Sequence, residues 1–549
     1  MKTERIVLLG VILCFLGGLL LAGCGDRTEN EQSTTGAQAP LPQIVRGGIY
    51  RVPLLNNPAT LDPAYVRDEY GTTLVQQLFD GLVRFDPYLL ILPALAETWQ
   101  VEEAGQVYQF VLREDARFHN GSKVTATDVV FSLSRLLRVE PSPAILPHLL
   151  RIVGAKAYRD QTSETVAGLQ IVDERTVRIR LAEPHAPFLT ALGMYQAKVV
   201  PKAEVDRLGE KFGQQPVGSG PFQFGSWDTG RQIRLKRFPG YFADPAYLDE
   251  IAYAIYPGDE RDAILSDFQD GRLEEMPVFG GARQALSLEE KIQRFHRPSL
   301  SLLFYGIRGS RPPLNDPGFR RALSLAIDRQ QLVTQVYKGQ FEPAWRVLPP
   351  GMPGFSPESS AQTDDPAATR EDLLSSVKAK AATLPPLEIV SASQSAFAQA
   401  ELSFIREAWA ELGLAVNIKY IPDWPEFEAY LQSDSVQIYR YAWFADIPDP
   451  DSFLYSLFSS ESPVNFMRFQ SRDIDQKLLR ARGISDPVER TGMYREIEDR
   501  IMESSPLLPL FYLSVDRMYR SHVQGARPSA LGSAYMPLHR VWLKMNSPS

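Results

Sequence analysis

The chain has 549 residues, a formal net charge of −8, and a composition that is 44% hydrophobic and 10% aromatic. These values describe a globular protein with enough apolar material for large cores, and the length suggests two to four domains. The acidic balance argues against a nucleic-acid footprint, which needs a basic patch, and against attraction to a membrane through charge.

The N-terminus has the layout of a secretory signal. Lys2 and Arg5 precede an apolar run over residues 6–22, and polar sequence begins at Asp26. The run is at the short limit for spanning a bilayer, and its glycines weaken it as a spanning helix. It ends in Leu21-Ala-Gly-Cys24, which resembles the bacterial lipobox. We therefore expect a signal peptide over residues 1–23 and lipidation of Cys24, with ordinary cleavage or an uncleaved anchor as the alternative.

Cysteine usage agrees with this interpretation. The chain contains only Cys14 and Cys24, and Cys14 lies inside the expected signal. A mature chain beginning at Cys24 has no second cysteine for an internal disulfide, so its stability must come from burial. Residues 24–45 are polar and rich in Ser, Thr, Gln and Pro, and they predict a flexible tether.

Two helix starts are visible in the body of the chain. Thr125-Ala-Thr-Asp128 is a capping box, and an apolar stripe at helical spacing follows it over residues 129–137. Asp316-Pro317 places an N-cap residue before a first-turn proline, with a second helical stripe after it. Residues 353–382, which contain few aromatic residues, predict an excursion over the surface.

The clearest unit lies between residues 387 and 421. Residues 387–390 form an apolar run, residues 402–412 have helical spacing that Gly413 can end, and residues 416–420 alternate as a strand. A strand, a helix and a strand at this spacing predict a right-handed parallel crossover. Residues 436–443 predict a further strand, so this half of the chain is of the α/β class.

No catalytic or metal-binding pattern stands out. The six histidines include none at metal-ligand spacing with another His or Cys, and no nucleophile elbow is present. The glycine-rich Val217-Gly-Ser-Gly-Pro-Phe222 lacks the lysine of a phosphate-binding loop, and it predicts a tight turn or a segment crossing between domains. We expect no enzyme activity, no metal and no cofactor.

Three residues are candidates for ligand contact. Trp424 and Asp446 follow the C-terminal ends of two predicted strands, where open α/β sheets bind ligands, and Arg440 lies within the second strand. A carboxylate there can pair with a ligand ammonium, an indole can cover an apolar group, and an arginine can bind a carboxylate. The structural alternatives are that Asp446 and Asp449 cap the helix starting near Ser452, that Trp424 is a core residue, and that Arg440 closes an internal ion pair.

An ordered set of motifs resembles a known family, the peptide/nickel class (family 5) of ABC-importer solute-binding proteins, over residues 47–525. The motifs are Thr60-Leu-Asp-Pro63, Gln77-Leu-Phe-Asp-Gly-Leu-Val83, Pro93-Ala-Leu-Ala-Glu-Thr-Trp99, Phe110-Val-Leu-Arg-Glu-Asp-Ala-Arg-Phe-His-Asn-Gly121, Thr125-Ala-Thr-Asp-Val-Val-Phe131, Val217-Gly-Ser-Gly-Pro-Phe222, Arg321-Ala-Leu-Ser-Leu-Ala-Ile-Asp-Arg329 and Trp443-Phe-Ala-Asp-Ile-Pro-Asp-Pro450.

The resemblance implies an α/β, periplasmic-binding-protein-like fold of type II, cluster C, with two mixed α/β lobes, an inserted third lobe and hinge strands. The expected hinge strands are Ser301–Tyr305 and Pro506–Tyr512, both apolar. Ligand is then enclosed by closure about the hinge. The expected boundaries are residues 46–79, 195–300 and 513–549 for lobe I, residues 80–194 for the inserted lobe II, and residues 301–512 for lobe III.

The resemblance also implies site residues. Asp446 matches the acid that holds a peptide α-ammonium, Arg440 matches an arginine near the peptide carboxylate in the oligopeptide branch, and Trp424 matches a tryptophan facing peptide side chains. Peptide backbone would pair with strand-like segments near Val66–Glu69 and Tyr441–Trp443. The further ligand contacts expected from these segments and from the hinge are Arg67, Asp68, Tyr441, Ala442, Trp443 and Tyr512.

The expected function is therefore that of an extracytoplasmic, lipid-anchored binding protein, acting as a monomer, that hands di- or oligopeptides to the permease of an ABC importer. Arg308 and the charged run Arg67-Asp-Glu69 depart from the family pattern and leave the substrate open. The alternatives are the same role for a metal chelate, an oligosaccharide or haem, and a signalling or chaperone role on the same fold.

Overall fold

The structure is a computed structural model that describes residues 44–258, 260–279, 291–357 and 370–544. The expected signal peptide, Cys24 and nearly all of the expected tether lie outside the described residues. Within these ranges, no helix combines the length and the apolar character needed to cross a membrane.

A four-stranded sheet has the order β1-β10-β9-β8, in which β1 pairs with β10 in parallel and the other pairs are antiparallel. Its core includes Leu74 of α1 as well as Val523, Met536 and Val541 from the far end of the chain. The elements are β1 (Ile49–Leu54), α1 (Glu69–Leu78), α6 (Lys202–Leu208), β8 (Phe222–Asp228), β9 (Gln232–Arg237), β10 (Glu250–Ile255), β20 (Val523–Gln524) and β21 (Trp542–Leu543). Segments from the start, middle and end of the sequence therefore share one core.

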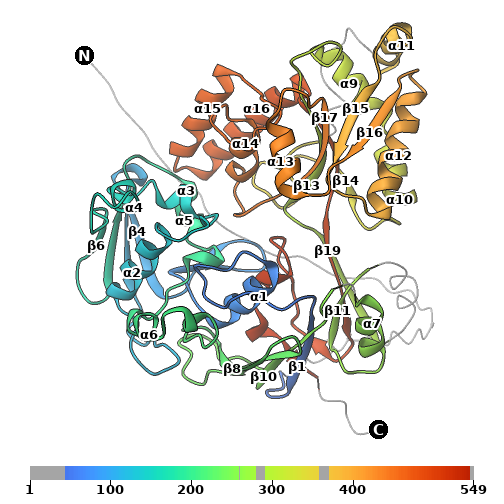
Figure 1. Ribbon diagram of the computed structural model, residues 1–549. Coiled ribbons are helices and arrows are strands. Elements are labelled where there is room, and N and C mark those ends of the chain that lie inside the picture. Colours follow the sequence, from blue (N-terminus) through green and yellow to red (C-terminus); the bar gives the residue numbers. More distant parts are fainter. Residues whose placement is uncertain (1–43, 259, 280–290, 358–369, 545–549) are drawn as a thin grey trace, which may run out of the picture. The chain divides into compact units, whose positions relative to one another are not determined.

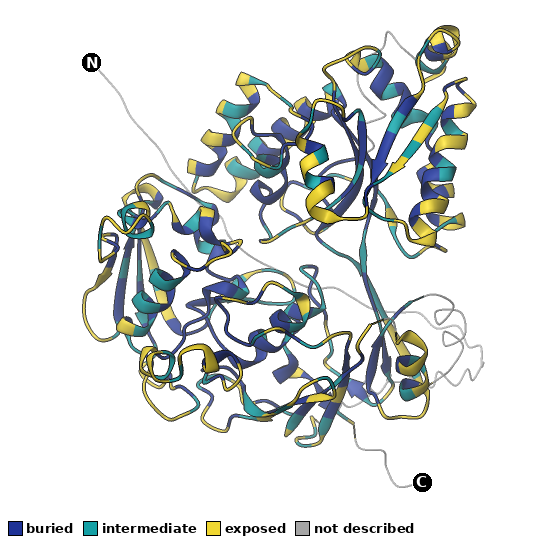
Figure 2. Cartoon of the chain, viewed as in Figure 1, coloured by how far each residue is buried: buried dark blue, intermediate teal, exposed yellow. Residues whose placement is uncertain are grey.

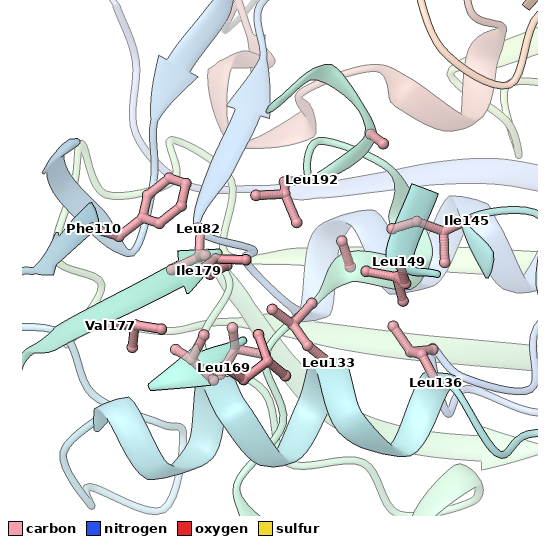
Figure 3. Close-up of a cluster of buried hydrophobic side chains, with 14 of the residues drawn as sticks. Leu82, Phe110, Leu133, Leu136, Ile145, Leu149, Leu169, Val177, Ile179 and Leu192 are labelled. Atoms are coloured by element: carbon pink, nitrogen blue, oxygen red, sulfur yellow. The ribbon is translucent and has the colours of Figure 1, made fainter. Parts of the chain in front are cut away.

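A second four-stranded sheet has the order β4-β5-β7-β6, and its strands lie in the part of the sequence between α1 and β8. The elements of this part of the chain are β2 (Val83–Phe85), β3 (Ile91–Pro93), β4 (Ala96–Glu102), β5 (Val107–Leu112), α2 (Ala126–Leu136), α3 (Leu146–Leu149), α4 (Ala155–Arg159), β6 (Leu169–Ile171), β7 (Thr176–Arg180) and α5 (Pro187–Ala191). The strands β2 and β3 form a separate two-stranded sheet. The predicted capping box is confirmed, since the Thr125 amide donates to Asp128 Oδ2 at 3.0 Å. Leu133 of α2 lies next to Leu169 of the sheet, and Leu136 lies toward Leu149 and Ile145 (Figure 3).

The glycine-rich segment 217–222 connects these two cores. The Gly220 amide donates to the carbonyl of Leu78 at 2.9 Å, and the His119 amide donates to the carbonyl of Gly218 at 2.8 Å. A Cβ on Gly218 would lie 1.9 Å from the Leu78 carbonyl oxygen, so only glycine fits this close approach. The prediction of a tight turn or crossing segment is confirmed.

A six-stranded sheet of order β14-β18-β13-β17-β15-β16 is formed by residues 301–512 (Figure 1). One face of the sheet packs Tyr439 and Tyr441 into one apolar core, and the other face packs Ile438 into another. The strands are β13 (Ser301–Ile307), β14 (Glu342–Pro343), β15 (Leu387–Ser391), β16 (Val416–Tyr420), β17 (Ile438–Phe444) and β18 (Leu507–Tyr512). The central strands are buried along most of their length, whereas the outer faces of the helices are exposed (Figure 2).

The helices around this sheet agree in part with the sequence predictions. They are α9 (Pro317–Ala326), α10 (Arg329–Gln335), α11 (Arg370–Ala381), α12 (Ala396–Ala410), α13 (Trp424–Gln432), α14 (Asp451–Phe458), α15 (Arg472–Gly483) and α16 (Pro487–Ser504). The N-cap at Asp316 and the parallel pairing of β15 with β16 are confirmed. The prediction of a surface excursion over residues 353–382 is in part wrong, because α11 occupies residues 370–381.

Two strands pass from the six-stranded sheet into a three-stranded sheet of order β11-β19-β12, with α7 (Arg261–Gln269) beside it (Figure 1). The three strands are β11 (Glu275–Pro277), β12 (Ile292–Pro298) and β19 (Ser514–Arg520). The chain crosses at Ser299–Leu300 and again at Leu513. The Ser299 amide donates to the Leu513 carbonyl at 2.8 Å, and the Leu513 amide donates to Ser301 Oγ at 3.2 Å. The two crossings are thus tied together. They lie just outside the expected hinge strands Ser301–Tyr305 and Pro506–Tyr512, which themselves pair within the six-stranded sheet.

Candidate functional site

A cleft of about 840 Å³ lies beside the two crossings. Its lining comes from the residues before and within α1, from Tyr195, from the crossing residues, from the end of β17 and from residues 530–535. The volume falls within the range of roughly 300–1,000 Å³ that is typical of ligand pockets. The cleft therefore joins segments that are hundreds of residues apart in the sequence, and we take it as the candidate site.

The turn after β17 carries Asp446 into this cleft. The indole Nε1 of Trp443 donates to the carbonyl of Ser452 at 2.7 Å, and the Asp446 amide donates to Ser452 Oγ at 3.2 Å. The Ala445 amide donates to the crossing residue Leu300 at 2.8 Å. These bonds fix the backbone on both sides of Asp446 and make no use of its carboxylate oxygens.

The two other acids of the same turn are neutralised. Asp449 accepts two bonds from Arg490 at 2.6 and 2.8 Å, and Asp451 accepts two from Arg482 at 2.8 and 2.9 Å. Both carboxylates are buried, and a paired arrangement of this kind compensates the loss of water. The capping alternative is wrong for Asp446, because Pro450 stands at the N-cap position of α14. It is correct for Asp449, whose Oδ1 accepts from the amide of Asp451, the first residue of the helix, at 2.9 Å.

Asp446 stands apart from these neighbours. Among the described residues, no side chain makes an ion pair or hydrogen bond with its carboxylate. The carboxylate is open to the cleft, yet protein surrounds it on most sides, and this desolvation raises its pKa to about 6. The same charge adds to the burial that raises the pKa values of Tyr195 and Tyr535, so both hydroxyls lie within its field. The site thus contains a fixed, uncompensated acid.

The last residues of β17 leave one side of the strand without a partner. β13 pairs with β17 along residues 438–444, whereas β15 pairs only with Ile438 and Tyr439. In the described part of the chain, residues 440–444 therefore have a strand partner on one side only. An extended segment could add at this edge.

Arg440 is engaged inside the protein rather than in the cleft. Its Nε and Nη2 donate to the two oxygens of Glu401 on α12 at 2.9 and 3.0 Å, and Glu401 also accepts from the hydroxyls of Tyr305, at 2.7 Å, and Tyr337. Burial alone would lower the pKa of Arg440, but the Glu401 carboxylate raises it well above its usual range. The alternative of an internal ion pair describes Arg440 correctly. Side chains alternate along a strand, so Arg440 faces the sheet side opposite to Tyr441 and Trp443.

The aromatic residues predicted to contact the ligand, Trp424, Tyr441 and Trp443, do not line the cleft. Trp424 is the first residue of α13 and is 49% exposed, and its ring lies 5.8 Å from that of Tyr441. Tyr441 is buried and also packs on Phe427 and Phe466. Neither Trp424 nor Tyr441 lines the cleft, and Trp443 supports the turn through its indole. The alternative of Trp424 as a core residue is wrong, because about half of the residue's surface is exposed.

The remaining predicted contacts are also placed. Arg67 lines the cleft, and its guanidinium donates to the carbonyls of Ala64, Val66 and Pro141 at 2.9, 2.7 and 2.6 Å. Asp68 lines the cleft too and caps α1 by accepting from the Gly71 amide at 2.7 Å. Neither Ala442 nor Tyr512 lines the cleft, since Ala442 packs against a core of the six-stranded sheet and the buried Tyr512 hydroxyl donates to the carbonyls of Arg346 and Leu348.

Several residues at the site were not identified from the sequence. Tyr195 and Tyr535 line the cleft within the field of the Asp446 charge, and Leu300 binds the turn, yet none of them stands in a motif that indicates this role. The partner of Arg440, Glu401, lies 39 residues earlier on a helix that only the tertiary fold brings to β17. The described residues contain no cluster of His, Cys, Asp and Glu able to hold a metal ion.

Residues 91–464 match the family model described as "Bacterial extracellular solute-binding proteins, family 5 Middle". The chain is 29% identical over 487 residues to the peptide transport periplasmic protein SapA of Salmonella typhimurium, and the alignment covers 84% of this chain and 86% of the relative. It is 26% identical over 460 residues to the dipeptide-binding protein of Escherichia coli, covering 80% of this chain and 84% of the relative.

A solved structure shares the fold. The periplasmic binding protein DppA of Helicobacter pylori, in complex with the peptide STSA, superposes with a TM-score of 0.71 at 24% identity. The superposition covers 91% of this chain and 99% of that protein. The periplasmic-binding-protein-like α/β fold predicted from the sequence is confirmed.

Proposed function

Because this chain belongs to family 5 of the bacterial extracellular solute-binding proteins, which are transport binding proteins and not enzymes, we propose that it captures peptides in its cleft and delivers them to an ABC importer. The observation that carries the proposal is the unpaired Asp446 carboxylate, which faces the cleft while Asp449 and Asp451 beside it are neutralised.

The peptide α-ammonium is the group that Asp446 suits. A desolvated carboxylate with a raised pKa gains when a cation replaces the missing water, and an ammonium supplies both charge and hydrogen-bond donors. The hydroxyls of Tyr195 and Tyr535, in the field of the same carboxylate, are placed to complete the polar surroundings of the ammonium.

The peptide backbone is proposed to add to β17 at residues 441–444, on the side where β15 no longer pairs. Main-chain bonds of this kind do not depend on sequence, so peptides with different side chains can bind. The exposed ring of Phe444 and the exposed Leu55 give the cleft apolar surface for these side chains.

Enclosure of the peptide is proposed to follow from bending at Ser299–Leu300 and Leu513, with the lobes as predicted from the sequence: residues 46–79, 195–300 and 513–549, residues 80–194, and residues 301–512. The paired crossings form a narrow connection of two strands, and hinge closure needs only a few residues of this kind to change.

The chain is further proposed to act as a monomer on the extracytoplasmic side of a membrane, held by lipid on Cys24 after removal of residues 1–23. The basic start, the apolar run and Leu21-Ala-Gly-Cys24 support this proposal. Replacement Cys24→Ser should move the protein from the membrane fraction to the soluble fraction, and retention in the membrane fraction would contradict lipid anchoring at this residue.

Native mass spectrometry of the protein purified from its expression host tests the ligand class. The expected result is a set of co-purified masses that fragment as peptides and that exchange for added mixed-sequence tri- to octapeptides. A retained oligosaccharide, haem or metal chelate that added peptides do not displace would replace peptides as the cargo.

A further inference from the structure

We infer that the protein binds a small monovalent anion, of the size of chloride, in an internal chamber that adjoins the cleft. The chamber has a volume of about 50 Å³ and lies between the end of α1, the strand β2 and residues 535–539. This volume is sufficient for roughly three particles the size of a water molecule. The inference is independent of the proposed function, because none of the residues that carry it lines the cleft.

A buried ammonium group without a protein partner lies at the chamber. Lys198 is 4% exposed and lines the chamber, and within the described residues its Nζ makes neither an ion pair nor a hydrogen bond. Its backbone is fixed, since Lys198 forms a bridge with Gly81 and the Val199 amide donates to the Asp80 carbonyl at 2.9 Å. Buried cations are normally paired, because the loss of water is costly. Lys198 therefore lacks a counter-ion.

The charge at the chamber is positive. Arg84 is a second cation in the lining, and its Nη1 donates to the hydroxyl of Tyr241 at 3.1 Å. The same hydroxyl bonds to Asp80, which is the one acid that lines the chamber in the part of the chain that the structure describes. Arg84, Tyr241 and Asp80 thus form a connected group in which one cation meets one anion, and the charge of Lys198 remains in excess.

The protonation states keep this excess at neutral pH. Burial lowers the pKa of Lys198 to about 8, which still leaves most of the ammonium groups charged at pH 7. Burial, and then the charge of Arg84, lower the pKa of His539 in the same lining to about 3, so its imidazole is neutral. One bound monovalent anion would balance the excess positive charge.

The size and chemistry of the chamber favour a single small ion. Water alone can bond to the Lys198 ammonium but cannot balance its charge, which has a larger electrostatic effect in the protein interior than in bulk water. The volume excludes ligands with many heavy atoms. A water molecule beside the ion could donate to Asp80 Oδ2, a buried oxygen that has no partner among the described residues.

The anion would support one wall of the cleft. Tyr535 lines both the chamber and the cleft, and its ring lies 6.3 Å from that of Phe85, which also lines the chamber. Asp80 belongs to the sequence motif 77–83, to which peptide capture assigns no role. The site would therefore serve the folded protein whether or not a peptide is bound.

Anomalous diffraction from crystals of the wild-type protein grown in sodium bromide tests the location of the anion. Bromide has the charge of chloride and nearly its size, and its anomalous signal identifies it among water molecules. An anomalous peak beside Lys198 Nζ in the chamber is the expected result. Peaks confined to the protein surface would show an adventitious ion only and would overturn the inference.

Thermal unfolding in chloride and in gluconate tests binding in solution. Gluconate supplies the same ionic strength with an anion too large for the chamber. Replacing gluconate by chloride at a constant ionic strength of about 100 mM should raise the melting temperature by about 2 °C or more, since a ligand that binds only the folded state stabilises it. Equal melting temperatures in the two salts would contradict the inference.

Lys198→Met is the variant that removes the excess charge, because Arg84 and Asp80 then balance each other. The rise in melting temperature with chloride should disappear in this variant. Lys211→Met is the matched control, since Lys211 is exposed and lies outside the chamber lining, and it should retain the full rise. Persistence of the rise in Lys198→Met would contradict the assignment to this chamber. The bromide experiment uses only wild-type protein and therefore decides the question even if Lys198→Met does not fold.

Discussion

At the scale of single residues, the ionised carboxylate of Asp446 lowers the stability of the folded protein. Burial raises its pKa to about 6, above the value near 3.9 expected in the unfolded chain, so the folded state holds this proton more tightly. The resulting contribution to stability is present below about pH 4 and is lost as the pH rises through about 6. At neutral pH the ionised carboxylate therefore opposes folding of the ligand-free protein.

Replacing Asp446 with asparagine should consequently raise the melting temperature of the ligand-free protein at neutral pH. The amide has nearly the same shape and carries no charge to desolvate. The gain should shrink toward about pH 4, where the wild-type carboxyl group is protonated as well. Thermal unfolding of both proteins across this range checks the prediction, and a variant less stable than the wild type at neutral pH would contradict it.

Residue roles could be predicted from the sequence only where the residue alone decides them. Asp446 follows a strand and was identified as a candidate on that basis. The fate of Arg440 depends on Glu401, and the neutralisation of Asp449 depends on Arg490, 41 residues later. Strand alternation by itself does place Arg440 and Trp443 on opposite faces, so a shared role in one site was the weaker hypothesis.

At the scale of elements, the turn between β17 and α14 depends on its two ion pairs. Asp449 joins the turn to Arg490 on α16, and Asp451 joins α14 to Arg482 on α15. Asp449→Asn should lower the free energy of unfolding by roughly 3–5 kcal/mol, because it leaves Arg490 buried without its anion. Urea unfolding measures this change.

Asp446→Asn is the matched control for that variant. The two substitutions are chemically identical and lie in one turn, yet they should move stability in opposite directions. Equal destabilisation by both would contradict the distinction between the neutralised acid and the acid that faces the cleft.

The open side of β17 gives a second prediction at this scale. Addition of a peptide strand should slow amide hydrogen exchange in residues 440–444, since new main-chain bonds would cover groups that have no strand partner there. The fully paired residues 303–306 of β13 serve as the internal reference. Unchanged exchange in residues 440–444 under saturating peptide would contradict strand addition.

Element prediction succeeded where local chemistry is strong. The capping box at Thr125, the N-cap at Asp316 and the parallel crossover around α12 were all correct. The helix α11 was missed, since its apolar residues form no pronounced stripe and its sequence resembles exposed loop. Trp424 was placed after a strand, but Asp423 caps a new helix there, and the indole lies at the exposed first turn.

At the scale of the whole molecule, the described chain passes between the six-stranded and three-stranded sheets at two crossings. One backbone bond from Ser299 to Leu513, and a second from Leu513 to the Ser301 hydroxyl, tie them together. A connection this small can bend while both sheets keep their pairing.

Peptide binding should therefore reduce the radius of gyration measured by small-angle X-ray scattering, because closure of the cleft makes the protein more compact. The Asp446→Asn variant should show no reduction when it is mixed with the same peptides at a concentration below its dissociation constant for them. An unchanged radius in the wild-type protein at saturating peptide would contradict hinge closure.

The central claim is that the ionised carboxylate of Asp446 holds the peptide ammonium, and isothermal titration calorimetry of wild-type and Asp446→Asn protein with one free-amino peptide mixture tests it most directly. The substitution should weaken binding by roughly 2–5 kcal/mol, which is about thirtyfold or more. Wild-type affinity should also fall as the pH drops below about 6, where a proton competes for the carboxylate, while the affinity of the variant should not depend on pH in this range. Equal affinities for the two proteins at neutral pH would contradict the account.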